Sequence, residues 1–134
     1  MSQLFRGPGF TVLLPDGWEG LERAETCTFF RAEDGVGAVT VSVLSSPMGV
    51  HPTPAHVLSE MAGDAALPCS LIPVGSAAEW ACGERRTKGV LWRYWVSTPD
   101  RTIVLVSYNC RAIYEGVEDD DVQEIVRTLR VDLA

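Results

Sequence analysis

The chain has 134 residues, which suits a single domain over residues 1–134 and is long enough to enclose a hydrophobic core. Apolar residues make up 46% and charged residues 22% of the sequence, a composition that excludes a disordered or fibrous protein. The formal net charge is -7, Lys88 is the only lysine, and the arginines are dispersed. This acidic balance argues against nucleic acid as a partner. The one basic cluster, Arg85 to Lys88, is interpreted as a solvated hairpin turn, with an anion site as the alternative.

Targeting segments are not evident. The stretch from Met1 to Phe10 lacks the apolar run of a signal peptide, and no stretch approaches membrane-spanning length. We therefore expect a cytoplasmic protein with no membrane partner, whose four cysteines are reduced. Cys27, Cys82 and Cys110 lie in strand-like runs, where a free cysteine usually behaves as a small buried apolar residue. A disulfide or a reactive thiol is the alternative.

Strand-like runs occupy the N-terminal third. The run from Phe10 to Leu14 predicts a strand, which the turn residues Pro15-Asp16-Gly17 end. A second strand is predicted over Ala24 to Arg31. After a turn at Glu33-Asp34-Gly35, the alternating valines from Ala38 to Leu44 predict a third.

The middle of the chain predicts one helix. Thr53 supplies an N-cap oxygen and Pro54 suits the first helical position. Apolar residues at helical spacing extend the predicted helix from Pro54 to Ala65. The stretch from Leu67 to Gly75 contains prolines and glycine, so it predicts an irregular connection with an extended piece at Leu71-Ile72.

Three further strand-like runs predict an antiparallel meander: Ala77 to Glu84, Val90 to Ser97, and Thr102 to Asn109. Pro99 cannot adopt positive φ, which excludes a two-residue mirror-image turn at Pro99-Asp100. A four-residue loop, Thr98 to Arg101, is predicted instead, with Ser97 opposite Thr102. Both faces of the last two strands are apolar, so we expect both faces to be covered.

The C-terminal segment predicts an amphipathic helix that ends near Arg130. Its apolar stripe comprises Val122, Ile125, Val126 and Leu129. The acidic residues at its start and the arginines at its end both suit the helix macrodipole. Together the elements predict an α+β fold: a three-layer α/β/α sandwich with a central antiparallel sheet of about six strands and a helix on each face.

Catalytic motifs are not apparent. The acidic run Glu118 to Asp121 is interpreted as a helix N-terminus rather than a metal site, because contiguous carboxylates on a helix point in different directions. His51 and His56 are five residues apart, which is not one helical turn, so metal binding or general-base chemistry is the less favoured reading. The sequence has no nucleophile elbow, dinucleotide fingerprint or Walker loop. We expect no catalytic, cofactor-binding or metal-binding residues.

The aromatic residues near Arg93 form the remaining candidate site. Arg93 lies between Leu91 and Trp95 and, in the predicted register, opposite Val106. Such a charge stacks on an aromatic ring, pairs with a carboxylate, or marks an incompletely covered patch where a partner binds. Aromatic residues anchor many interfaces, although in a small sandwich most fill the core. The predicted partner-binding residues are Arg93, Trp95, Tyr108 and Trp18.

Several segments resemble a known family: FTVLLPDGW at Phe10 to Trp18, GVGAVTVSVL at Gly35 to Leu44, RYWV at Arg93 to Val96, VSYNC at Val106 to Cys110, and the closing EDDDVQEIVRTLRV. They look like small bacterial proteins of the PsbP-like and Mog-type sandwich superfamily, which includes a DcrB-like branch. The resemblance covers nearly the whole chain. It implies a mostly non-enzymatic protein, because similar proteins bind protein partners, assist photosystem assembly, or act as chaperones for type VI secretion effectors.

The leading hypothesis is therefore a non-catalytic, cytoplasmic protein-binding module. A secretion-effector chaperone and an immunity-type partner are the roles that such a module would fit. The alternative is a small-molecule carrier that uses a gap between helix and sheet, and the third hypothesis is an enzyme with a spatially assembled site. The oligomeric state is open, with a homodimer as one possibility.

Overall fold

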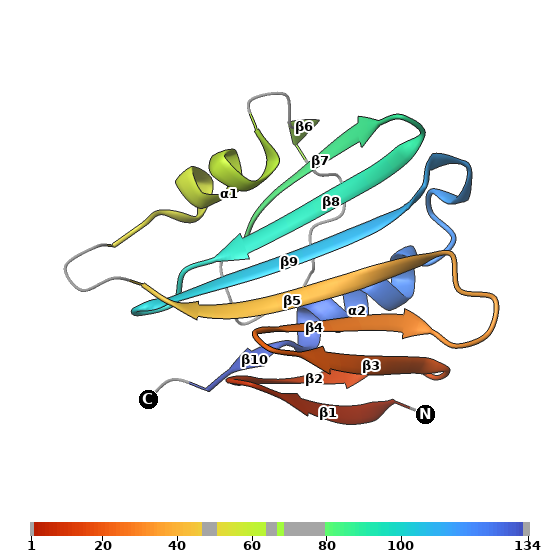
Figure 1. The fold of residues 1–134 in the computed structure, drawn as a ribbon, viewed down its shortest axis with the longest axis horizontal. Helices are drawn as coiled ribbons and strands as arrows, with labels where there is room; N and C mark the ends of the chain where they lie inside the picture. The colour runs from red at the N-terminus through yellow and green to blue at the C-terminus, as the bar shows by residue number, and fades with distance from the viewer. Residues whose placement is uncertain (1, 47–50, 64–66, 69–79, 133–134) are drawn as a thin grey trace.

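The structure, a computed structural model, describes residues 2–46, 51–63, 67–68 and 80–132. It is a mostly-sheet α+β fold with two helices, α1 (Pro54–Ala62) and α2 (Asp119–Thr128), and a 3-10 turn, η1 (Ala112–Tyr114) (Figure 1). In chain order the strands are β1 (Gln3–Gly7), β2 (Phe10–Leu14), β3 (Trp18–Arg23), β4 (Thr26–Arg31), β5 (Gly37–Ser45), β6 (Leu67–Pro68), β7 (Ala81–Thr87), β8 (Val90–Ser97), β9 (Thr102–Arg111) and β10 (Arg130–Val131).

The predicted antiparallel sheet of about six strands is confirmed. The main sheet has the order β3-β4-β5-β9-β8-β7, and the two-residue β6 follows β7 at its edge. A second, smaller sheet, β1-β2-β10, lies beside β3 and was not predicted (Figure 1). Of its strands only β2 was predicted. β10 has only two residues, and β1 is short and largely exposed, with no alternating apolar pattern.

The observed ends of the strands and of α1 agree closely with the predicted ones where apolar residues are dense. β2 and β8 have the predicted bounds, whereas β4 begins two residues later and β9 ends two residues later than predicted. α1 begins as predicted, because the Thr53 hydroxyl accepts a hydrogen bond from the His56 amide at 3.2 Å. It ends at Ala62, where Gly63 adopts φ +79° and caps the helix. The predicted extended piece at Leu71-Ile72 lies outside the described residues.

The predicted register of the last hairpin is wrong by two residues. Ser97 lies opposite Val104, not Thr102. Thr102 pairs only on the other side of β9, with Ser45 of β5. The connection closes through Asp100 at φ +53° and a hydrogen bond from the Thr102 amide to the Pro99 carbonyl. A two-residue shift preserves the faces of a strand, so Arg93 and Trp95 share one face with Val106 and Tyr108 in either register.

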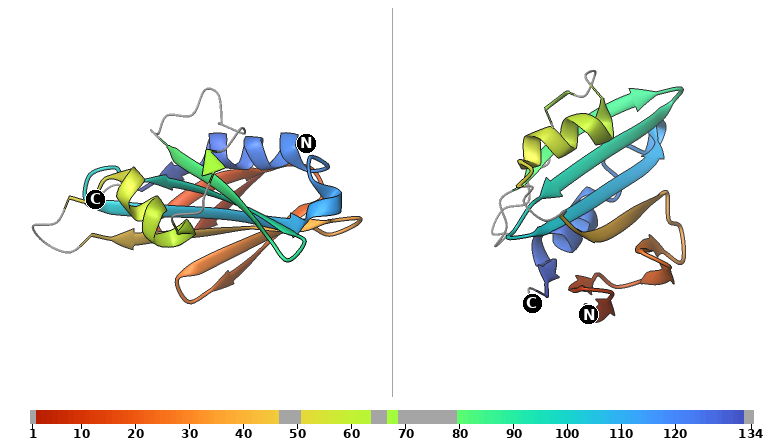
Figure 2. Two further views of the ribbon diagram at one scale, coloured as in Figure 1. Left: turned by 90° about the horizontal axis from the view of Figure 1, so that it is seen from above. Right: turned by 60° about the vertical axis from the view of Figure 1, so that its left-hand side comes forward.

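The core lies between α2, the small sheet and one face of the main sheet. β5, β8 and β9 contribute alternate residues, and α2 contributes its predicted stripe, which is buried throughout. α2 runs along one side of the main sheet (Figure 2) and packs against β2. Thr128 of α2 also accepts a hydrogen bond from the Leu13 amide of β2. These contacts fix the helix relative to both sheets.

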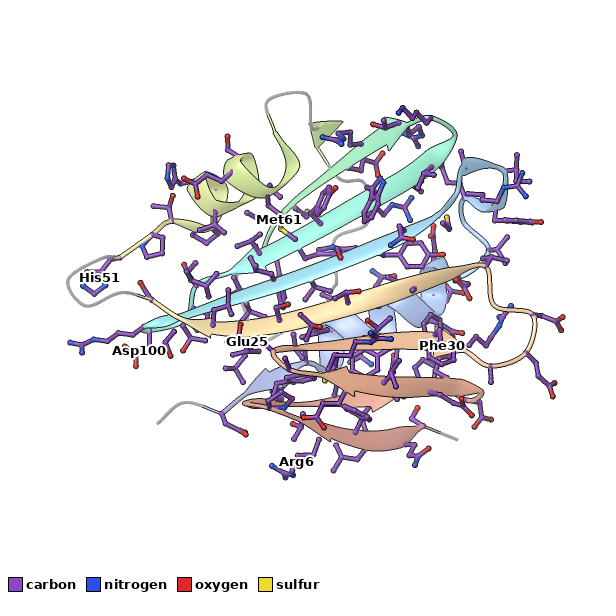
Figure 3. The ribbon with its side chains drawn as sticks, viewed as in Figure 1. Arg6, Glu25, Phe30, His51, Met61 and Asp100 are labelled. Atoms are coloured by element: carbon purple, nitrogen blue, oxygen red, sulfur yellow. The ribbon has the colours of Figure 1, made fainter. Side chains whose placement is uncertain are left out.

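The other face of the main sheet is only partly covered. Tyr94 and Val96 of β8 are buried there, and α1 packs against β7 and β8 with Met61 directed toward the sheet (Figure 3). Farther along, Thr40 and Ser107 are half-buried polar residues. The expectation that both faces of the last two strands are covered therefore fails over β9, where Ile103, Leu105 and Ser107 are only half-buried on this face. That a helix covers each face stays a prediction.

Candidate functional site

Arg93 is buried, with 3% of its surface exposed. It lies opposite Tyr108 and Glu84 rather than Val106. Its Nε donates to Glu84 Oε2 at 3.2 Å and its Nη1 donates to Asp119 Oδ1 at 2.7 Å. Burial disfavours the charged guanidinium, but these two carboxylates outweigh that effect and raise the pKa of Arg93. Of the three predicted alternatives, the carboxylate pair is the one observed.

Two other predicted partner-binding residues also contact the acidic start of α2. The Tyr108 hydroxyl donates to Glu118 Oε1 at 2.8 Å, and Trp18 Nε1 donates to Asp121 Oδ2 at 2.9 Å. With the Arg93–Asp119 pair, three residues of the acidic run therefore bind three side chains of the strands. The run does more than complement the helix dipole, because it also fixes the helix to the main sheet.

The four predicted partner-binding side chains are all inaccessible in this structure. Trp95 is fully buried in the core, and Arg93, Tyr108 and Trp18 are no more than 4% exposed. Partner binding through them stays a prediction. It would have to operate indirectly, through the surface that they support.

Glu118 joins this cluster to the β4–β5 connection. Its side chain is buried and accepts a hydrogen bond from the Val36 amide at 3.4 Å, and Arg31 Nε lies 4.0 Å away. Burial and the hydrogen bond to Glu118 raise the pKa of Tyr108 well above its ordinary value. The phenol is therefore a stable proton donor to this carboxylate.

A chain of ion pairs connects Arg93 to the surface. Glu84, which binds Arg93 through one oxygen, accepts from Arg86 Nη1 at 3.3 Å through the other. Arg86 Nε donates in turn to Glu115 Oε1 at 3.1 Å. Because Arg93 also binds Asp119, both ends of the segment from Glu115 to Asp119 are held by arginines that share Glu84.

The β9–α2 loop, residues 112–118, is also ordered by its own backbone. The Ala112 amide donates to the Gly89 carbonyl of the β7–β8 hairpin at 2.8 Å, and the Val117 amide donates to the Tyr114 carbonyl at 3.1 Å. Gly116 adopts φ +91° between them, a conformation that favours glycine. The loop is therefore fixed both to the sheet and internally.

This fixed loop carries three exposed apolar side chains, which we term the β9–α2 patch: Ile113, Tyr114 and Val117. Their exposed fractions are 72%, 37% and 55%. Among the described residues, the other large exposed apolar side chains are Leu4 and Leu13, which face each other across β1 and β2, and Leu21 of β3. Sequence reasoning missed the patch. The sequence does contain a signal for it: Ile113, Tyr114 and Val117 are apolar residues in a segment that belongs neither to a predicted strand nor to the apolar stripe of the C-terminal helix.

The remaining sequence candidates do not converge on a site. His51 is exposed near one end of the main sheet (Figure 3), and His56 Nε2 lies 3.1 Å from Glu60 Oε1 on the surface of α1. Arg85 and Arg86 belong to β7, and Lys88 forms the hairpin turn with φ +54°. In the part of the chain that the structure describes, no group of three or more metal-ligating side chains is gathered.

The cysteines bear on the alternative of a disulfide or a reactive thiol, and the packing of the core bears on the alternative of a small-molecule carrier. Cys27 and Cys110 are buried free thiols, and Cys82 is half-buried. Burial raises the pKa of the Cys27 and Cys110 thiols.

The space between α2 and the main sheet is occupied by core side chains. It therefore gives no support to the predicted gap between helix and sheet in which a carrier would bind a small molecule. Over the described residues, no helix combines the length and apolarity that crossing a membrane requires.

Comparison with known proteins identifies the fold. No protein-family model matches the sequence, and no curated protein sequence does either. Among solved structures, "Protein Mog1 E65A mutant" superposes with a TM-score of 0.60 at 15% identity, covering 98% of this chain and 96% of Mog1. PsbP (CyanoP) from Synechocystis sp. PCC 6803 gives a TM-score of 0.56 at 11% identity, with coverages of 97% and 92%. This chain has the PsbP/Mog1-like fold.

The PsbP/Mog1-like fold also occurs in a longer bacterial chain. A protein from Bacteroides thetaiotaomicron VPI-5482 superposes with a TM-score of 0.62 at 14% identity, covering 96% of this chain. This chain spans only 47% of the Bacteroides one. At such identities the likeness extends to the fold. It confirms the sequence resemblance and leaves role and partner to be argued from this chain's own surface.

Proposed function

We propose that this protein is a non-catalytic protein-binding module and that the β9–α2 patch is its main contact surface. The observation that carries the proposal is exposed apolar surface on a fixed loop. Ile113 and Val117 are more than half exposed. Their exposure is unfavourable in the free protein, because burying one methylene group stabilises by roughly 0.8 kcal/mol. Grouped apolar residues on a surface are typical of protein interaction sites.

The order of the loop supports the same proposal. Binding a flexible loop costs roughly 0.5–1.5 kcal/mol for each side chain that must be immobilised. Here Arg86 holds the loop at Glu115, and Arg93 holds the adjoining first residue of α2, Asp119, before any partner arrives. In this proposal Arg93, a predicted partner-binding residue, is a positioning residue. A cytoplasmic secretion-effector chaperone or immunity-type partner would use such a preorganised surface.

The test is site-specific crosslinking in a lysate of the source organism. A photo-crosslinking amino acid replaces Val117 in one protein and Leu4 in the matched control, because Leu4 is 60% exposed on β1. We expect a discrete protein adduct from position 117 only. Adding Ile113→Ser should reduce that adduct at least tenfold without lowering Tm, since the side chain is mostly exposed.

Three outcomes would count against the proposal. The absence of an adduct at position 117, equal adducts at both positions, or an adduct that Ile113→Ser leaves unchanged would each remove its basis. An adduct between two copies of this chain would assign the patch to a homodimer instead.

A further inference from the structure

A second surface lies at the edge of the main sheet that β3 forms. β3 is the terminal strand of that sheet, and five of its six residues are exposed. The Ala32 amide donates to the Gly17 carbonyl at 2.8 Å, which sets the alternation of hydrogen bonds between β3 and β4. By that alternation, Gly20 and Glu22 direct their backbone N–H and C=O groups away from β4. Within the described residues, no strand pairs with this side of β3.

Two adjoining depressions border the first half of this edge, at Trp18, Glu19 and Gly20, beside the small sheet. One, of about 400 Å³, is lined by Phe5 and Leu14 as well as Trp18, Glu19 and Gly20. The other, of about 800 Å³, continues from Trp18 and Glu19 toward the β4–β5 connection. The edge therefore borders a groove whose floor at one end is apolar and which has room for side chains of an added strand.

The other end of the groove is acidic. Asp16, Glu19, Glu33 and Asp34 line the larger depression and are exposed. Arg31 is the single cation among the lining residues, and its guanidinium donates to the carbonyls of Glu33 and Asp34. Four carboxylates thus face solvent beside a free strand edge, against one guanidinium that is bound to the backbone.

We propose that the free edge of β3 binds an extended, lysine- or arginine-rich segment of a partner protein by strand addition. The added backbone would pair with Gly20 and Glu22, and its basic side chains would meet the carboxylates of the groove. Strand addition at an exposed edge gains affinity from main-chain hydrogen bonds and specificity from alternate side chains. A second copy of this chain fits less well, because it would bring Glu19 and Glu22 against the same carboxylates of its neighbour.

A synthetic twelve-residue peptide that alternates lysine with valine and threonine is the probe. Titrated into the ¹⁵N-labelled full chain, it should shift the amide resonances of Gly20 and Glu22 and slow their hydrogen exchange at least fivefold. The same peptide with glutamate in place of lysine should bind at least tenfold more weakly. The lysine peptide should also weaken as salt is raised, since exposed charges are screened.

The matched variants are Glu22→Pro and Glu22→Gln. Both remove the carboxylate, but only proline removes the outward N–H, which an edge strand tolerates. We expect Glu22→Pro to raise the peptide Kd at least fivefold above that of Glu22→Gln. Ile113→Ser should leave the Kd unchanged, so this inference and the proposed function fail separately.

Equal affinity of the two Glu22 variants, or binding without protection of Gly20 and Glu22, would overturn strand addition. Undetectable binding of the lysine peptide would overturn the proposal altogether. Protection of the same amides in a concentrated sample without peptide would assign the edge to a second copy.

Discussion

Buried polar and charged side chains of the strands hold the start of helix α2 in place. Arg93, Tyr108 and Trp18 each bind a different acidic residue at the start of α2. Buried charges are costly unless they are paired and hydrogen-bonded, and each of these groups has a partner of suitable chemistry. An arginine in a strand therefore indicates here a carboxylate that comes from another element, rather than an external ligand.

Removing the Arg93 guanidinium should lower the free energy of unfolding. Arg93→Met keeps much of the side-chain volume but leaves Glu84 without its buried partner, and breaking a buried pair costs about 3 kcal/mol or more. We expect a loss of that size in the free energy of unfolding, measured by urea denaturation. Arg101→Met, at an exposed arginine, is the control. A loss for Arg93→Met of under about 1 kcal/mol would contradict the assignment.

Alkaline pH should destabilise the fold. Burial raises the pKa of Cys27 and Cys110 above 9.0 and that of Tyr108 above 10.0 in the folded protein, so the native state keeps protons that the unfolded chain releases. Their contribution to stability is complete below pH 9 and is lost as pH rises beyond it. Each group can change the free energy of unfolding by up to about 1.4 kcal/mol per pH unit.

Urea unfolding at pH 8, 9 and 10 measures this dependence. Cys110→Ala should reduce the slope between pH 9 and 10, because one of the two buried thiols is removed. An identical slope in the variant would show that Cys110 does not contribute.

At the scale of elements, the sequence predicts what is regular and apolar. β8 has its predicted bounds because its dense apolar and aromatic run has no turn residue, and α1 begins at Thr53 because the cap chemistry is local. β3 was missed because glycine, glutamate and arginine at an edge resemble a loop. The β9–α2 patch was missed because its fixed conformation depends on Arg86 and Arg93, which bind it from other strands.

The contact between Trp18 and Asp121 tests how α2 is held. Trp18→Phe removes the indole N–H, and Asp121→Ala removes the acceptor. A double-mutant cycle should give a coupling of about 1 kcal/mol, the usual net value of a hydrogen bond. Trp92→Phe, at a half-exposed position on the other face, combined with Asp121→Ala should give none. A coupling near zero for the Trp18 pair would mean that packing alone places the helix.

At the scale of the whole molecule, two sheets are joined by aromatic rings. Phe5 of β1 and Phe10 of β2 both meet Phe29 of β4 edge to face, with ring centroids 4.9 and 6.3 Å apart. The sequence placed Phe10 and Phe29 in strands but could not pair them, because the small sheet and the main sheet share no backbone ladder. Such a contact depends on the packing of side chains rather than on periodicity.

Gly20 controls how closely the sheets approach. A Cβ at this position would lie 2.6 Å from the Phe5 ring and 2.9 Å from the Phe29 ring. In an open strand, alanine would stabilise relative to glycine by roughly 0.5–1 kcal/mol, whereas overpacking costs about 1–3 kcal/mol. We expect Gly20→Ala to destabilise, because the second effect is the larger. Phe5→Leu supplies a smaller side chain, so Gly20→Ala should cost at least about 1 kcal/mol less in that background. Urea denaturation of the four proteins measures both costs, and equal costs would mean that the ring of Phe5 does not set the distance between the sheets.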